Sequence, residues 1–326
     1  MKHNNITKIF LPLVFLLTLA SCDSNMNSSS AVSVNESSSE NNLTDIDIFI
    51  FMGQSNMAGR GDASQAVKVG ENHAFEFRAV TDPTKLYPMR EPFGENENQP
   101  GGINDVKEND GKKLGGLASA FCEAYYQNTH VPVIGVSASQ GGTNVDEWQL
   151  GEGKIEDAKN RLDLCQCYLN STELYNIRHI NMVWLQGEAD ANSEVRGPYE
   201  YYVPHMQNII KEMQKVGVEN CFVIQVGNYM KSVNETYYQN YKEMQAKQFK
   251  WCQEYDNSIM SSIKLADMPE SMMHLNNHYL QPAYNVVGND AGKNTAYYIN
   301  TGKTPTCQAY VEGEEDHINP LLSEGK

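Results

Sequence analysis

Ser55 stands in the segment MGQSNMAG, at the end of a run of apolar, mostly β-branched and aromatic residues. Such a run is typical of a buried parallel strand, and Gly53 permits a tight turn at its end. A serine at the carboxyl edge of a sheet, just ahead of a helical turn, is well placed for a nucleophile, because backbone N–H groups there can stabilise negative charge. The alternative is that Ser55 only caps a helix.

Ester hydrolysis at a serine also needs donors for the oxyanion and a base for the proton. Gly141 and Gly142 follow a strand-like run, where paired glycines either permit a bend or offer an unobstructed N–H group. Gln186 ends the run MVWLQ and offers a neutral amide donor, unless it is solvent-exposed. Glu188, two residues later, has three open roles: to bind a sugar hydroxyl, to fix Gln186, or to lie in solvent.

Two histidines near the C-terminal end are candidates for the base. His274 and His278 lie four residues apart in HLNNH, a spacing that also suggests a metal site. The segment lacks the glutamate that zinc proteases carry beside the first histidine, and no third ligand is apparent. We therefore predict no metal.

Four blocks of the chain resemble one family. These are GQSNMAGRG from residue 53, SASQGGTNVDEW from residue 137, WLQGEAD from residue 184 and HYLQPAYNVVG from residue 278. They occur in the order found in the SGNH-hydrolase superfamily, in the branch of carbohydrate acetylesterases that includes sialate O-acetylesterase-like and acetylxylan-esterase-like proteins. The blocks span nearly the whole chain after the N-terminal leader.

The resemblance implies roles for the candidate residues. Ser55 would be the nucleophile and His278 the general base, because the spacing downstream of His278 matches the family's last block. Gly142, preferred over Gly141, and Gln186 would form the oxyanion hole. Many SGNH enzymes present an asparagine where this chain has Gln186.

One position departs from the family pattern. The family places an aspartate three residues before the catalytic histidine, and this chain has Leu275 there. If His274 is taken as the base, the residue three positions earlier is Ser271, which is not an acid either. Either Asp267, Glu270 or a backbone carbonyl supports His278 instead, or the enzyme works as a slower Ser–His dyad, or hydrolysis has been lost.

These features predict a serine carbohydrate esterase that removes O-acetyl groups from acetylated sugars or polysaccharides without a cofactor. The alternative is a catalytically weak or inactive glycan-binding lipoprotein on the same fold. A lipase-like or thioesterase activity is a third, less supported reading. Trp148 either stacks on a sugar or belongs to the core.

The N-terminal residues predict export and a lipid anchor. Residues 1–21 contain Lys2 and Lys8, a short apolar run and Leu-Ala-Ser before Cys22, as in a bacterial lipoprotein signal peptide. Cys22 would be lipidated, and residues 22–44, rich in Ser and Asn, would form a flexible tether. We expect a protein held at the membrane of a bacterial cell envelope, with an esterase domain over residues 45–326.

Net charge limits the possible partners of the protein, and the periodicity of apolar residues predicts its fold. The 326-residue chain carries 25 Lys+Arg against 41 Asp+Glu, a net charge of −16, with no basic stripe, so we predict no nucleic-acid partner. Strand-like and helix-like runs alternate, which predicts a three-layer α/β/α sandwich with a mainly parallel sheet, flavodoxin-like as in SGNH hydrolases. Strands are expected at residues 47–52, 132–137, 180–186, 221–226 and 258–265. Helices are expected at 117–127, 155–169, 199–216, 240–255 and 284–299, and a long irregular segment at 71–114.

Overall fold

The protein was analysed as a computed structural model that describes residues 43–105 and 112–318. All of them belong to one compact unit, Asn42–Lys326. The predicted signal peptide, Cys22 and most of the predicted tether lie outside the described residues.

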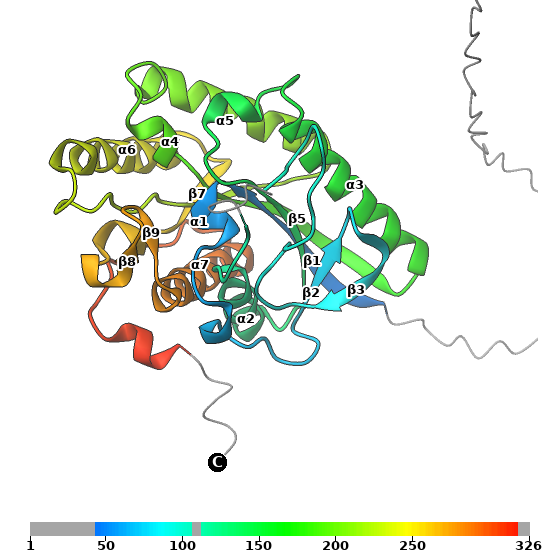
Figure 1. Cartoon of the computed structure of the whole chain (residues 1–326). Coiled ribbons are helices and arrows are strands. Elements are labelled where there is room, and N and C mark those ends of the chain that lie inside the picture. Colours follow the sequence, from blue (N-terminus) through cyan, green and yellow to red (C-terminus); the bar gives the residue numbers. More distant parts are fainter. Residues whose placement is uncertain (1–42, 106–111, 319–326) are drawn as a thin grey trace, which may run out of the picture. The chain divides into compact units, whose positions relative to one another are not determined.

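A seven-stranded sheet forms the middle layer, in the order β3-β2-β4-β1-β5-β6-β7 (Figure 1). Every neighbouring pair is parallel except β2 and β3, which are antiparallel. The central strand, β1, pairs with β4 and β5. Its apolar side chains are buried on both faces of the sheet, as the continuous apolar run predicts. The strands are β1 (Thr44–Gly53), β2 (Ala74–Arg78), β3 (Asp82–Pro88), β4 (Val133–Ser139), β5 (Tyr175–Leu185), β6 (Cys221–Ile224) and β7 (Ser258–Ser262).

Helices cover both faces of this sheet. The helices α2 (Ala118–Thr129) and α7 (Gln281–Thr301) pack on each other against one face, and α3 (Lys154–Thr172), α5 (Tyr199–Gln214) and α6 (Glu235–Glu254) cover the other (Figure 1). The predicted three-layer α/β/α fold with a mainly parallel sheet is therefore confirmed. Each predicted helix is present, with ends that differ by a few residues.

The predicted irregular segment at residues 71–114 is partly wrong. It contains β2 and β3, which extend the sheet at one edge. The strand β2 has only five residues, and its buried Glu76 carboxylate bonds Arg78 and the Gly94 N–H, which breaks the apolar pattern. The strand β3 is mostly exposed at the sheet edge, so hydrophobicity does not reveal it either.

Three short elements near the carboxyl edge of the sheet were also not predicted. They are the single turn α4 (Glu188–Ala191) and the two strands of a hairpin, β8 (Met273–His274) and β9 (His278–Tyr279). The hairpin is separate from the main sheet. Elements of two to four residues are too short for a hydrophobic period to be read from them.

The six cysteines in residues 43–105 and 112–318 are all free thiols. None of the helices in these residues combines the length and the apolar composition that a bilayer crossing requires.

Candidate active site

The central strand delivers Ser55 to the carboxyl edge of the sheet. Ser55 is the first residue of α1 (Ser55–Ala58), two residues after β1 ends at Gly53, and it keeps 6% of its surface exposed. Gly53 has φ +135°, and a Cβ there would lie 2.1 Å from the Leu185 carbonyl oxygen of the neighbouring strand. Only glycine therefore fits at this turn.

The β8–β9 hairpin brings His278 to Ser55. The His278 Nε2 atom lies 2.8 Å from the Ser55 Oγ atom, within hydrogen-bond distance. His274 pairs with His278 across the hairpin, and the two ring centroids are 6.2 Å apart. The His274 Nε2 atom is buried without a hydrogen-bond partner in the described residues. Of the two candidate histidines, the structure places His278 at the serine.

No carboxylate supports His278 in the part of the chain that the structure describes. Its Nδ1 atom is buried and has no hydrogen-bond partner there. Leu275, at the family's aspartate position, lies in the hairpin turn with φ +49° and is 61% exposed. Glu270 accepts hydrogen bonds from Ser232 instead, and Asp267 is exposed. None of the substitutes considered from the sequence reaches the ring.

The His278 imidazole is nevertheless suited to act as a base at neutral pH. Burial lowers the pKa of His278 from 6.5 to about 4, and the positive charge of Arg60 and the neighbouring His274 act in the same direction. A histidine with this pKa is neutral at pH 7, so Nε2 can accept the Ser55 proton.

The backbone N–H groups of Gly142 and Ser55 are available for an oxyanion, whereas that of Gly141 is not. The Gly141 N–H donates to Asp105 Oδ1 at 3.1 Å and is therefore occupied. The Gly142 N–H has no partner among the described residues, and Gly142 lines the same cavity as Ser55. The Ser55 N–H lies in the first turn of α1, where N–H groups lack intrahelical partners.

Gln186 is not brought to this cavity. It is fully buried, and its Nε2 atom donates to the Thr143 carbonyl at 3.0 Å and to Asp190. The neighbouring amide is Gln54, which sequence reasoning missed and for which the only signal was its place beside Ser55. Its Oε1 atom accepts from the Ala189 N–H at 3.2 Å and from Gln186 Nε2 at 3.4 Å, and Gln54 lines the cavity.

Glu188 lies at the start of α4 and is almost fully buried. Its Oε1 atom accepts a hydrogen bond from Asn56 Nδ2 at 2.7 Å, while its Oε2 atom has no partner in the described residues. Burial raises the pKa of Glu188 to about 7. Glu188 makes no hydrogen bond to Gln186 in this structure, so the role of fixing Gln186 directly is not observed.

These groups surround a cavity of about 410 Å³, within the usual range for small-molecule sites. Ten residues line it: Gln54, Ser55, Arg60, Gly141, Gly142, Glu188, Ala189, Tyr241, Asn277 and His278. Trp148 is not among them. It is fully buried and packs edge-on against Trp184 at 5.6 Å between ring centroids, so it belongs to the core.

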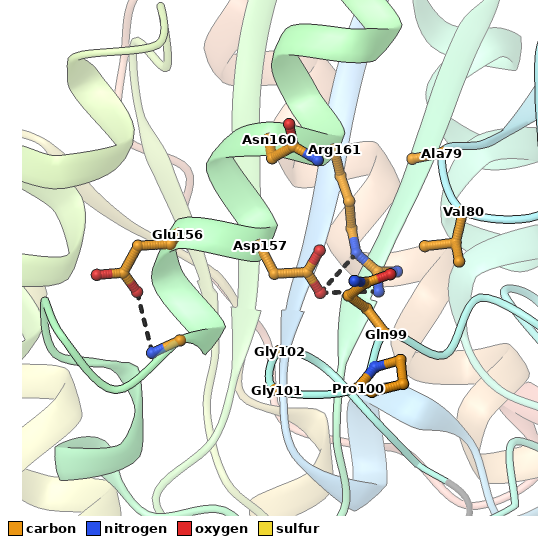
Figure 2. Close-up of a pocket in the computed structure, with 11 residues that line it drawn as sticks. Ala79, Val80, Gln99, Pro100, Gly101, Gly102, Glu156, Asp157, Asn160 and Arg161 are labelled. Carbon is orange, nitrogen blue, oxygen red and sulfur yellow. Dashed lines mark hydrogen bonds and ion pairs between the residues drawn. The ribbon is translucent and has the colours of Figure 1, made fainter. Parts of the chain in front are cut away.

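A second cavity, of about 460 Å³, lies where α3 begins and shares no lining residue with the first (Figure 2). Its charged groups are engaged within the protein: Asp157 Oδ2 accepts from Arg161 and the Ile103 N–H, and Glu156 accepts from the Gly153 N–H. No nucleophile and base are paired there. Within residues 43–105 and 112–318, no group of three or more His, Cys, Asp or Glu side chains is arranged to hold a metal ion.

The fold is SGNH-like, and the candidate site pairs a serine with a histidine. The family model described as carbohydrate esterase, sialic acid-specific acetylesterase, matches residues 45–289, which is most of the chain. The chain therefore belongs to this carbohydrate esterase family, as the four sequence blocks predict. No curated protein matches it.

Solved structures share the fold at low sequence identity. A protein from Arabidopsis thaliana is 18% identical, with a TM-score of 0.56 over 78% of this chain and 98% of its own. The protein NanS is 12% identical, with a TM-score of 0.57 over 80% of this chain and 99% of its own. A carbohydrate acetylesterase from Xanthomonas citri is 14% identical, with a TM-score of 0.50 over 79% of this chain and 57% of its own.

Proposed function

We propose that this protein is a serine esterase that removes O-acetyl groups from carbohydrate. The observation that carries the proposal is the 2.8 Å distance between Ser55 Oγ and His278 Nε2 in a cavity of substrate size. Gly142 lines the same cavity, and its N–H has no partner among the described residues. Family membership supports the same reaction class, and so does the description of the Xanthomonas citri neighbour as a carbohydrate acetylesterase.

The reaction follows the usual two steps of a serine hydrolase. Ser55 Oγ attacks the acetyl carbonyl carbon while His278 Nε2 takes the hydroxyl proton. The Ser55 and Gly142 N–H groups, with the Gln54 amide nitrogen, stabilise the oxyanion, and this arrangement puts Gln54 in the role first expected of Gln186. The ester bond then breaks and His278 returns the proton to the departing sugar oxygen. A water molecule activated by His278 attacks the acetyl–serine, which releases acetate and restores Ser55.

Acetate release from a panel of acetylated sugars tests the proposal. The panel includes acetylated xylan, O-acetylated sialic acid and a chromogenic acetyl ester, because the structure favours none of these sugars. Ser55→Ala is expected to lower kcat by about 10⁴-fold or more. Ser171→Ala, at an exposed serine near the end of α3, is the control and should retain full activity. Acetate release that is unchanged by Ser55→Ala would refute the esterase proposal.

A catalytically silent glycan-binding protein is the second candidate. The His278 Nδ1 atom has no hydrogen-bond partner in the described residues, which favours this candidate, since a carboxylate there normally orients the ring and stabilises its charged form. The same panel decides between the two. Binding of an acetylated glycan without acetate release by the native chain would favour the silent protein.

We also propose that Cys22 anchors the protein to the membrane of a bacterial cell envelope. Support comes only from residues 1–22, with their basic start, apolar run and Leu-Ala-Ser-Cys ending. Metabolic labelling with a fatty-acid analogue should modify the native chain and not Cys22→Ala. Equal labelling of both chains, or of neither, would contradict the anchor.

A further inference from the structure

The hairpin that carries His278 has few bonds of its own. Its strands β8 and β9 pair over two residues each, and an isolated two-stranded hairpin is at best marginally stable in water. Its turn holds Leu275 and Asn276 at φ +49° and +68°, in the left-handed region that leucine rarely adopts. No carboxylate bonds the His278 ring in the described residues, so we look to other contacts of the hairpin to position the base.

Asn56 makes such a contact. It directly follows Ser55, it is fully buried, and its Nδ2 atom donates to the Asn277 carbonyl oxygen at 3.1 Å. Asn277 directly precedes His278. The residue after the nucleophile is therefore hydrogen-bonded to the residue before the base, which ties the two reacting side chains together over a very short path.

The Asn56 amide is itself held in one orientation. Its second Nδ2 donor goes to Glu188 Oε1 at 2.7 Å, and its Oδ1 atom accepts from the Tyr284 hydroxyl at 2.8 Å. These bonds come from α4 and α7, so Asn56 links the hairpin to two elements outside it. Because each donor and the acceptor is engaged, rotating the amide would break several buried hydrogen bonds at once.

We propose that Asn56, oriented by Glu188, is the positioning residue that holds His278 at Ser55 in place of the family's aspartate. The Glu188 carboxylate then serves the reaction through Asn56. This assignment rests on the proposed esterase activity, because it concerns the geometry of the Ser55–His278 pair.

The first test compares the Asn56→Ala variant with the native protein, both as full-length chains. We expect kcat on the chromogenic acetyl ester to fall by about 10- to 100-fold, because a small misplacement of a catalytic group has an effect of this size. The KM should change by less than about threefold. Asn181→Ala is the matched control, because Asn181 is also fully buried but its side chain bonds Asn220 and not the hairpin that carries His278. It should lower thermal stability without lowering kcat.

The second test separates positioning from a general loss of structure. In a His278→Ala background the residual activity no longer depends on the imidazole, so adding Asn56→Ala should change it by less than about twofold. An equal loss from Asn56→Ala with and without His278 would overturn the proposal. Abolition of activity by Ser55→Ala, with no effect of Asn56→Ala on kcat, would overturn it while leaving the esterase function intact.

A pair of substitutions at Glu188 keeps the proposal testable if Asn56→Ala does not fold. Glu188→Gln retains an oxygen acceptor for Asn56 Nδ2, and Glu188→Leu removes it. We expect Glu188→Gln to lose less than about threefold in kcat and Glu188→Leu to lose about 10-fold or more. Equal losses from both variants would show that Glu188 does not act as the acceptor for Asn56, and would contradict its place in the proposal.

Discussion

The two halves of the Ser–His pair are positioned in different ways. Ser55 follows the central strand of a seven-stranded sheet, and Gly53 packs so closely on Leu185 that no side chain fits there. His278 lies on a hairpin of two-residue strands whose turn contains two residues at positive φ. The nucleophile follows a long strand inside the packed core, whereas the base lies on a short hairpin that buried Met273 and Tyr279 and a few hydrogen bonds hold in place. Substitutions on the two sides should therefore fail differently.

After Ser55→Ala, the largest effect is expected from substitution of the base itself. His278→Ala should lower kcat by about 10³-fold or more, because it removes the group that accepts the Ser55 proton. His274→Ala should change kcat by less than about threefold, since its ring makes no contact with Ser55. Steady-state kinetics on the chromogenic ester distinguish the two variants. A larger loss from His274→Ala would show that the base has been assigned to the wrong histidine.

The next largest effect is expected on stability, from a substitution in the turn that carries the nucleophile. Gly53→Ala places a Cβ 2.1 Å from the Leu185 carbonyl oxygen at φ +135°, so we expect a loss of about 4 kcal/mol or more in unfolding free energy. Gly151→Ala is the control, because Gly151 also has positive φ but open space around it. Urea unfolding measures both. Equal losses would mean that backbone conformation, and not close packing, sets the requirement.

The pH profile of kcat/KM then tests the environment of the base. His278 must be neutral to accept a proton, and burial lowers its pKa from 6.5 to about 4, so activity should fall only as the pH drops through about 4. Because the folded-state pKa is the lower one, the unfolded chain takes up this proton first. Stability should therefore also decline as the pH falls from about 6.5 to about 4. An acidic limb near pH 6.5 would indicate a solvated ring.

The smallest effect is expected from restoring the family's residue. Leu275 is 61% exposed, so the side chain of Leu275→Asp should point to solvent and change kcat/KM by less than about threefold. Aspartate tolerates positive φ better than leucine, which should leave stability equal or slightly higher. A tenfold gain in kcat/KM, with an acidic limb moved to higher pH, would show that the hairpin can rearrange into a Ser–His–Asp triad.

The arrangement of the main elements was predictable because each has a strong local signal. The apolar run of β1 and the helical periods of α2 and α7 are long enough to be read directly, and alternation then implies parallel crossovers. The edge strand β3 and the hairpin β8–β9 were missed, since one is mostly exposed and the other is only two residues per strand.

The functional site, like the fold, was predictable only in those features that are local in the sequence. Residue types, their order and the family blocks were enough to name a serine, two histidines and the missing aspartate, because these are properties of the chain itself. The tertiary structure decides three further points: which histidine lies at Ser55, which amide lines the cavity and what Asn56 bonds. These depend on segments more than 100 residues apart in sequence, as in the Asn56–Glu188 and Ser55–His278 contacts. Gln54 lines the cavity, whereas Gln186 is buried and bonds the Thr143 carbonyl and Asp190. These contacts join separate segments of the chain, and no local pattern encodes them.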